Sequence, residues 1–206
     1  MSEIDRIMGL SPVIPVLVVH DVAHAHPIAK ALVAGGLRVL EVTLRTPAAL
    51  DVIAEMAKVE GAVVGAGTVL NEADLESSIL AGAEFIVSPG LTDGLGKAAV
   101  ARRIPFLPGV ANAGDIMRGL DLGLDRFKFF PAEAAGGIKA LKALSAPFGN
   151  VRFCPTGGID HARAPEWLAL PFVRCVGGSW LVPTGVPDTR EIECRAAMAA
   201  KLARAA

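Results

Sequence analysis

Cysteine is scarce in this sequence of 206 residues, and the three that occur follow no functional spacing. Cys154, Cys175 and Cys194 form neither a CxxC pair nor a zinc-binding pattern. The sequence therefore predicts no disulfide scaffold and favours a reducing, cytoplasmic environment. The four histidines show no ligand spacing with carboxylates. We expect neither a metal ion nor an organic cofactor.

An excess of charge of one sign is also missing. The 20 Lys and Arg residues nearly balance the 21 Asp and Glu residues, and the formal net charge is −1. Nucleic acids are bound by basic surfaces that release counterions, so this composition argues against a nucleic-acid partner.

No apolar run is long enough to cross a membrane. The longest clean run, residues 13–19, has about a third of the length that a membrane-spanning helix needs. The first six residues include two acids and no apolar core, which is atypical of a signal peptide. Because 52% of the residues are hydrophobic, they must fill an interior, and a single domain of this size buries roughly 70% of its unfolded surface.

The sequence does contain a regular alternation of two kinds of segment. Short β-branched runs begin near residues 13, 37, 62, 84, 104, 125, 151 and 172. Between them lie Ala- and Leu-rich segments of helical period, including 23–34, 47–58, 72–81, 113–122, 137–144 and 187–205. Strands alternating with helices predict βαβ units, and eight such units predict an α/β fold, a (β/α)8 TIM barrel spanning 1–206 as a single domain. Residues 2–9 predict a short N-terminal helix across the bottom of the barrel. A doubly wound open sheet is the alternative, but its Gly-rich first turn is absent.

The second predicted strand places two charged residues on its inner face. Side chains of a barrel strand alternate between the interior and the helix layer, and active sites lie at the strands' C-terminal ends. The apolar face, which suits the helix layer, consists of Leu40, Val42 and Leu44. The residues that then face inward are Val39, Glu41, Thr43 and Arg45. These charges indicate a functional site, with a structural Glu–Arg ion pair as the alternative.

The sixth predicted strand carries Lys128, the only lysine expected on a strand. Two flanking phenylalanines suit the helix layer, so Lys128 and Phe130 face inward. Desolvation disfavours the charged form of such an amine, and a neutral lysine can attack a carbonyl to form a Schiff base. A structural ion pair of Lys128 with Glu41 or Glu133 is the alternative.

Glycine-rich turns follow the last two strands, at Gly157-Gly158 and Gly177-Gly178. Paired glycines let backbone N–H groups converge on an anion, and barrels frequently bind phosphate with the loops after strands 7 and 8. The two turns predict a phosphate site, with tight turns that bind nothing as the alternative.

Six motifs occur in order on six predicted strands: EVTLRT (41–46), GAGTV (65–69), SPGL (88–91), FKFFPAE (127–133), FCPTGGI (153–159) and GGSWLVP (177–183). Together they resemble the family of 2-keto-3-deoxy-6-phosphogluconate (KDPG) and 4-hydroxy-2-oxoglutarate aldolases. The resemblance runs in one register from about residue 11 to residue 183. It implies a homotrimeric (β/α)8 barrel that cleaves KDPG, in the Entner–Doudoroff pathway, to pyruvate and glyceraldehyde 3-phosphate through a lysine Schiff base.

The resemblance also implies roles for individual residues. Lys128 forms the Schiff base, and Glu41 accepts and donates protons. Arg45 holds the pyruvyl carboxylate with the help of Thr68. The residues that line the pocket and influence stereoselectivity are Pro89, Phe130 and Thr156. The residues that bind phosphate are Gly157, Gly158, Gly178 and Ser179.

One position departs from the family pattern. Some members carry an arginine near the end of the first strand that reaches the substrate, whereas Val18 occupies this position here. His20 is nearby but is more simply explained as structural. Two alternative functions stay open. The first keeps the lysine chemistry and acts on 4-hydroxy-2-oxoglutarate or 2-dehydro-3-deoxy-6-phosphogalactonate. The second is a barrel that binds a phosphosugar without a Schiff base.

Overall fold

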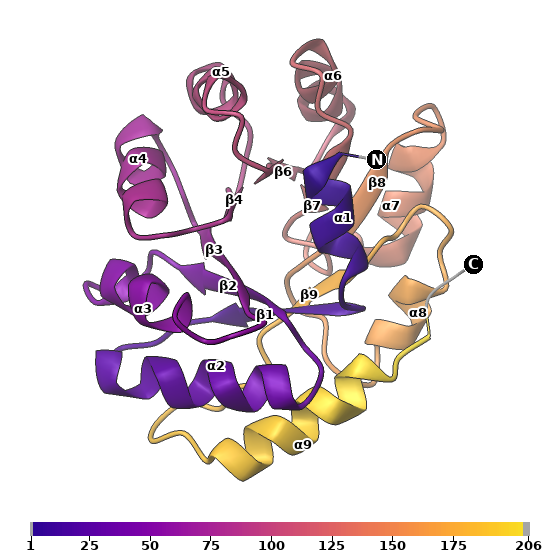
Figure 1. The fold of residues 1–206 in the computed structure, drawn as a ribbon. Coiled ribbons are helices and arrows are strands. Elements are labelled where there is room, and N and C mark those ends of the chain that lie inside the picture. The colour runs from indigo at the N-terminus through magenta and orange to yellow at the C-terminus, as the bar shows by residue number, and fades with distance from the viewer. Residues whose placement is uncertain (1, 204–206) are drawn as a thin grey trace.

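The computed structural model describes residues 2–203 and consists of parallel strands surrounded by helices (Figure 1). The strands are β1 (Val13–Leu17), β2 (Val39–Thr43), β3 (Val63–Gly67), β4 (Phe85–Val87), β5 (Phe106–Leu107), β6 (Gly109–Val110), β7 (Arg126–Phe129), β8 (Arg152–Pro155) and β9 (Val176–Gly178). The helices are α1 (Glu3–Gly9), α2 (Ala25–Ala34), α3 (Ala49–Met56), α4 (Glu72–Leu80), α5 (Asp93–Ala101), α6 (Ala113–Asp121), α7 (Gly137–Ser145), α8 (Ala164–Leu168) and α9 (Thr189–Ala200), with a 3-10 turn η1 (Val22–His24).

The strands form a curled parallel sheet, so the predicted α/β class is confirmed. One sheet has the order β5-β4-β3-β2-β1-β9, and a second has the order β6-β7-β8. The segment 106–110 belongs to both, since β5 pairs with β4 and β6 pairs with β7 on either side of Pro108. Isolated parallel bridges join Phe153 to Val173 and Thr156 to Gly177. This largely sequential order lacks the reversal that defines a doubly wound sheet.

The elements agree with the predicted segments, with shifts at their ends. The N-terminal helix predicted over 2–9 is α1, and the helix predicted over 187–205 is the shorter α9. Positions 204 and 205 of that prediction lie outside the described residues. No helix among the described residues combines the length and the apolar character needed to cross a membrane.

Two apolar clusters lie on opposite faces of the strands, as the alternation along residues 39–45 predicts. Val39 belongs to a smaller cluster inside the curled sheet, whereas Leu40 and Val42 belong to a larger cluster shared with the helices. Phe127 and Phe129 also belong to the larger cluster, which leaves Lys128 between them on the inner face. The predicted directions of the side chains on β2 and β7 are confirmed.

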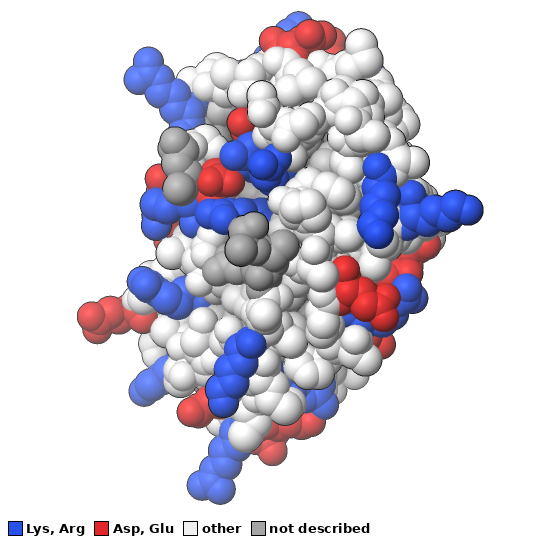
Figure 2. All heavy atoms as spheres, turned by 90° about the vertical axis from the view of Figure 1, so that its right-hand side faces the viewer, with Lys and Arg blue, Asp and Glu red and all other residues white. Residues whose placement is uncertain are grey.

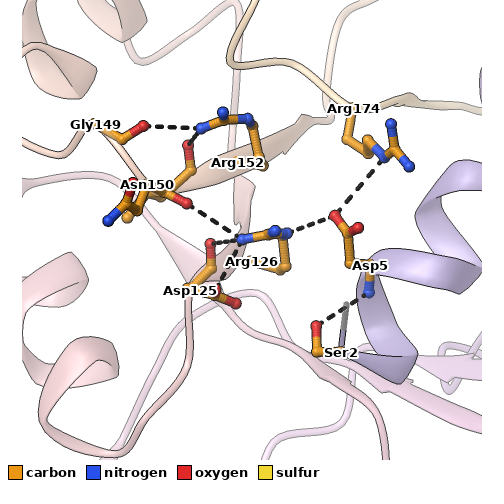
Figure 3. Close-up of polar contacts among 9 residues, drawn as sticks. Ser2, Asp5, Asp125, Arg126, Gly149, Asn150, Arg152 and Arg174 are labelled. Atoms are coloured by element: carbon orange, nitrogen blue, oxygen red, sulfur yellow. Dashed lines mark hydrogen bonds and ion pairs between the residues drawn. The ribbon is translucent and has the colours of Figure 1, made fainter.

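Helix α1 lies against the N-terminal end of the inner cluster. Its apolar contribution to that cluster is Ile4, Ile7 and Met8. Figure 3 shows Asp5 of α1 directed toward Arg126 at the start of β7, with Oδ1 2.6 Å from the guanidinium Nε. Arg174, ahead of β9, places its Nε 3.7 Å from the same oxygen. This charge cluster fixes α1 at one end of the sheet, and the candidate site residues lie at the other.

The charges on the face formed by α7 and α8 are mixed. Figure 2 shows Lys and Arg side chains interspersed with Asp and Glu on this face rather than gathered into one basic surface. This distribution agrees with the net charge of −1.

Candidate active site

Lys128 and Glu41 meet in the interior of the curled sheet. Lys128 lies on β7 and Glu41 on β2, so their side chains approach across the interior rather than along one strand. The amine Nζ donates a hydrogen bond to Oε1 of Glu41 at 3.0 Å. Lys128 is 6% exposed and Glu41 is 3% exposed. A carboxylate at this distance can take a proton from the amine and return it, which is the geometry of acid–base chemistry.

The amine of Lys128 also lies 5.2 Å from the centroid of the Phe130 ring. That distance is within the range of a cation–π contact. On the neighbouring strand, Gly109 is in register with Lys128. A Cβ at Gly109 would lie 2.1 Å from the carbonyl oxygen of Pro89, so only glycine lets the SPGL loop approach this closely. Pro89 is thereby placed beside the strand that neighbours the lysine.

The space occupied by Glu41 exists because β3 carries no side chain at Gly67. A Cβ built at Gly67 would lie 2.3 Å from Oε1 of Glu41 and 2.7 Å from its Cγ. Real Cβ atoms do not approach other atoms this closely. Gly67 therefore sets the position of the carboxylate that contacts Lys128.

Arg45 is exposed just beyond the C-terminal end of β2, and a hydrogen-bond chain fixes its direction. Its Nε donates to Oγ1 of Thr43 at 3.1 Å. That hydroxyl donates to the carbonyl oxygen of Leu17 on β1 at 2.8 Å. Glu41 and Arg45, the two charged residues predicted to face inward, therefore do not pair with each other. Glu41 pairs with Lys128, and Arg45 is held by the buried Thr43.

Thr68 follows β3 directly, with a φ of 60°. This left-handed conformation is unusual for a β-branched residue, and such strained residues cluster at functional sites. The strain lies at the same end of the sheet as Arg45, because β2 and β3 pair in parallel from Val39–Val63 to Thr43–Gly67.

The two glycine turns lie side by side at the ends of β8 and β9, because Thr156 is bridged to Gly177. Gly157 and Gly158 have φ values of 106° and 78°, which L side chains rarely adopt. A Cβ at Gly177 would lie 2.3 Å from Oγ1 of Thr156. Ser179 is exposed beyond the second turn. The predicted phosphate residues are thus brought together at one end of the sheet.

The position that some family members fill with arginine is also at this end. Val18 is 40% exposed. Together with His20 it lines a cavity of about 370 Å³ between the end of β1 and residues 182–186.

Comparison with known proteins identifies the family. The family model for KDPG and KHG aldolases, where KHG denotes 4-hydroxy-2-oxoglutarate, matches residues 4–194. The chain belongs to this aldolase family. The 2-dehydro-3-deoxy-phosphogluconate aldolase of Zymomonas mobilis is 61% identical over 206 residues, which are 100% of this chain and 99% of that protein.

Solved structures of the aldolase family have the same fold. The KDPG aldolase of Zymomonas mobilis, crystallised with 3-phosphoglycerate, has a TM-score of 0.97 at 61% identity, covering 98% of this chain and 97% of that one. The KDPG aldolase of Legionella pneumophila, with pyruvate captured at low pH as a covalent carbinolamine, has a TM-score of 0.91 at 43% identity. It covers 98% of each chain.

Two residues beside this aldolase-family site are not identified by sequence reasoning alone. Gly67 belongs to the GAGTV motif, which directs attention to the threonine instead. The sequence offers Glu133 only as one of two alternative partners of Lys128, and the structure pairs Lys128 with the other, Glu41. The carboxylate of Glu133 instead accepts a hydrogen bond from Trp167 and forms an ion pair with Arg163. In the sequence, only membership of a motif draws attention to Gly67 or Glu133. The residues that they contact lie on other strands and helices.

Proposed function

We propose that this chain is a class I aldolase, a carbon–carbon lyase that cleaves KDPG to pyruvate and glyceraldehyde 3-phosphate with Lys128 as the Schiff-base residue. The observation that carries this proposal is the buried pair of Lys128 and Glu41, 3.0 Å apart, in a chain of the aldolase family. The chemistry of the Entner–Doudoroff pathway requires this cleavage.

Lys128 in its neutral form attacks the C2 ketone of the substrate and gives a carbinolamine, which loses water to form an iminium. The iminium accepts the electron pair of the C3–C4 bond as that bond breaks and the C4 hydroxyl loses its proton. Glu41 takes this proton, directly or through a water molecule, and then protonates C3 of the pyruvate enamine. Hydrolysis of the resulting iminium releases pyruvate and regenerates the amine.

The substrate is held at both ends in this proposal. Arg45 binds the pyruvyl carboxylate with two parallel hydrogen bonds, and Thr68 assists it. The hydrogen bond from Arg45 to Thr43 supports a fixed direction of the guanidinium. The residues proposed to line the pocket are Pro89, Phe130 and Thr156. The residues proposed to bind phosphate are Gly157, Gly158, Gly178 and Ser179.

The proposed catalytic unit is a closed (β/α)8 barrel formed by the whole chain as one domain. It is supported by the segment 106–110, which pairs with β4 and then with β7, and by the bridges between residues 153–156 and 173–177. The homotrimer implied by the family stays a prediction that sedimentation velocity can test. The cytoplasmic location, expected from the cysteine pattern, is likewise a prediction.

A second substrate, 4-hydroxy-2-oxoglutarate, is favoured by the family description, which names both activities. Its cleavage needs the same lysine and carboxylate but no phosphate site. The ratio of kcat/KM for the two substrates measures how strongly the glycine turns contribute.

Trapping with borohydride tests the Schiff base. The protein is incubated with pyruvate and sodium borohydride, digested, and analysed by mass spectrometry. We expect a reduced pyruvyl adduct on Lys128, and none in Lys128→Ala. The matched control is Lys139→Ala, since Lys139 is an exposed lysine on α7. Absence of an adduct would refute the mechanism and favour a barrel that binds phosphosugars without covalent chemistry. An adduct on another lysine would refute the assignment of Lys128 as the Schiff-base residue.

A further inference from the structure

Glu133 uses both carboxylate oxygens, one to contact Trp167 in α8 and the other to contact Arg163 just before this helix. Trp167 donates its indole N–H to Oε1 at 3.0 Å. Arg163 places Nη1 3.0 Å from Oε2. The Trp167 side chain is fully buried, so the bond from Glu133 satisfies a donor that has been removed from water.

The same residue also lies directly against the first glycine turn. The backbone N–H of Glu133 donates to the carbonyl oxygen of Gly157 at 3.1 Å. A Cβ at Gly158 would lie 2.8 Å from Cβ and 2.9 Å from Cγ of Glu133. The side chain of Glu133 therefore packs on the turn, and its carboxylate binds the helix that follows the turn.

These contacts reach the strand that carries Lys128. The ring of Trp167 lies 6.3 Å from that of Phe129, the residue after Lys128 on β7. The turn thus lies against residues 130–133, which follow β7, and Glu133 in this segment contacts α8. A binding site for an anion made of backbone N–H groups depends on such fixed surroundings, because the groups must be oriented before the anion arrives.

We propose that Glu133 is a positioning residue that holds the Gly157–Gly158 turn in the geometry that binds the substrate phosphate, and so determines the preference for phosphorylated substrates. This inference rests on the proposed function. Glu133 carries a negative charge near an anion site, and its ion pair with Arg163 offsets the repulsion that this charge would cause.

Two aldehyde acceptors that differ only in the phosphate group separate this role from a general structural one. Condensation of pyruvate with glyceraldehyde 3-phosphate and with glyceraldehyde is measured for Glu133→Ala, Glu133→Gln and Trp167→Phe. The matched control is Glu166→Ala, because Glu166 is an exposed glutamate on α8. Thermal unfolding and borohydride trapping of pyruvate are recorded for every variant.

We expect Glu133→Ala to raise KM for glyceraldehyde 3-phosphate by at least about tenfold, because the buried indole of Trp167 loses its acceptor and the turn loses the packing of the Glu133 side chain on Gly158. The kcat and the kcat/KM for glyceraldehyde should stay within about threefold of the wild-type values. Such a change is smaller than the loss of one hydrogen bond would cause. Glu133→Gln keeps an acceptor for Trp167 and should restore most of the affinity. Trp167→Phe keeps an aromatic ring and should raise the same KM, which provides a test even if Glu133→Ala does not fold.

Equal losses for both aldehydes, or no change in KM for the phosphorylated one, would overturn the role of Glu133. A wild-type protein that gives no pyruvyl adduct would instead overturn the proposed function, so the two failures are distinguishable.

Discussion

Replacement of Gly67 by alanine tests whether Glu41 must occupy its observed position for catalysis. Ordinary van der Waals contact with a Cβ begins near 3.4 Å, whereas the new methyl group would lie 2.3 Å from Oε1 of Glu41. The oxygen must therefore shift by about 1 Å, which disturbs the geometry of its 3.0 Å hydrogen bond to Lys128. A displacement of about 1 Å at a reacting group can cost about a hundredfold in rate.

The effect on stability should be small by comparison. The three nearest atoms that the methyl group meets are all in the Glu41 side chain and none is in the backbone, so rotation of that side chain can relieve the contact without movement of the strands. Alanine is also favoured over glycine within an element by roughly 0.5–1 kcal/mol. We therefore expect Gly67→Ala to lower kcat about a hundredfold while the free energy of unfolding changes by less than about 1 kcal/mol.

Gly65→Ala, two residues earlier on β3, is the contrasting variant. Its Cβ would lie 2.5 Å from the ring of Phe85, which is fully buried and cannot swing away. Overpacking of this kind costs about 1–3 kcal/mol, so urea denaturation should detect a larger loss of stability than for Gly67→Ala. The assays are the initial rate of pyruvate release and the urea midpoint. A wild-type kcat in Gly67→Ala would refute the reasoning, as would a loss of stability that accounts for the loss of rate.

Two further predictions concern charged residues. Asp5→Asn should lower the free energy of unfolding by about 1.5–3 kcal/mol, because a charge-assisted hydrogen bond to Arg126 is lost although Arg126 keeps its ion pair with Asp125. Denaturation in urea measures this loss, and a change below about 1 kcal/mol would contradict it. Arg45→Lys should raise KM for pyruvate in the condensation reaction about tenfold, since an ammonium group cannot bind a carboxylate through two parallel bonds. Initial rates at varied pyruvate give this constant, and an unchanged KM would exclude Arg45 as the carboxylate ligand.

The directions of the side chains could be predicted from sequence because they depend only on local periodicity. A strand alternates its faces, so the apolar Leu40 and Val42 place Glu41 on the inner face without knowledge of any other strand. The same rule singles out Lys128 between two phenylalanines. Both residues are where the alternation predicts them.

The choice between the two partners that the sequence offers for Lys128, Glu41 and Glu133, depends on the third dimension and could not be made from sequence alone. Glu41 and Lys128 are 87 residues apart, and their contact follows from how tightly the sheet curls. Periodicity within one strand carries no information about curvature. The contact of Glu133 with Trp167 is of the same kind, since α8 must first be placed beside the end of β7.

The fifth predicted strand, which begins near residue 104, is followed by a second short strand, and one proline separates the two. Proline has no backbone N–H to donate to a ladder, so Pro108 separates β5 from β6. Phe106–Leu107 pair with β4 and Gly109–Val110 pair with β7, on either side of this proline. The proline is visible in the sequence, but the sequence does not predict which neighbouring strand each side pairs with.

The charge cluster beneath α1 has a consequence for the order of folding during synthesis. Asp5 leaves the ribosome early, yet its partner Arg126 follows 121 residues later, and Arg174 comes later still. We therefore expect α1 to remain undocked, with its apolar face exposed to water, until the ribosome has synthesised the last third of the chain. Contacts between such distant parts of a sequence form slowly, so the segment made first would be among the last to reach its final place.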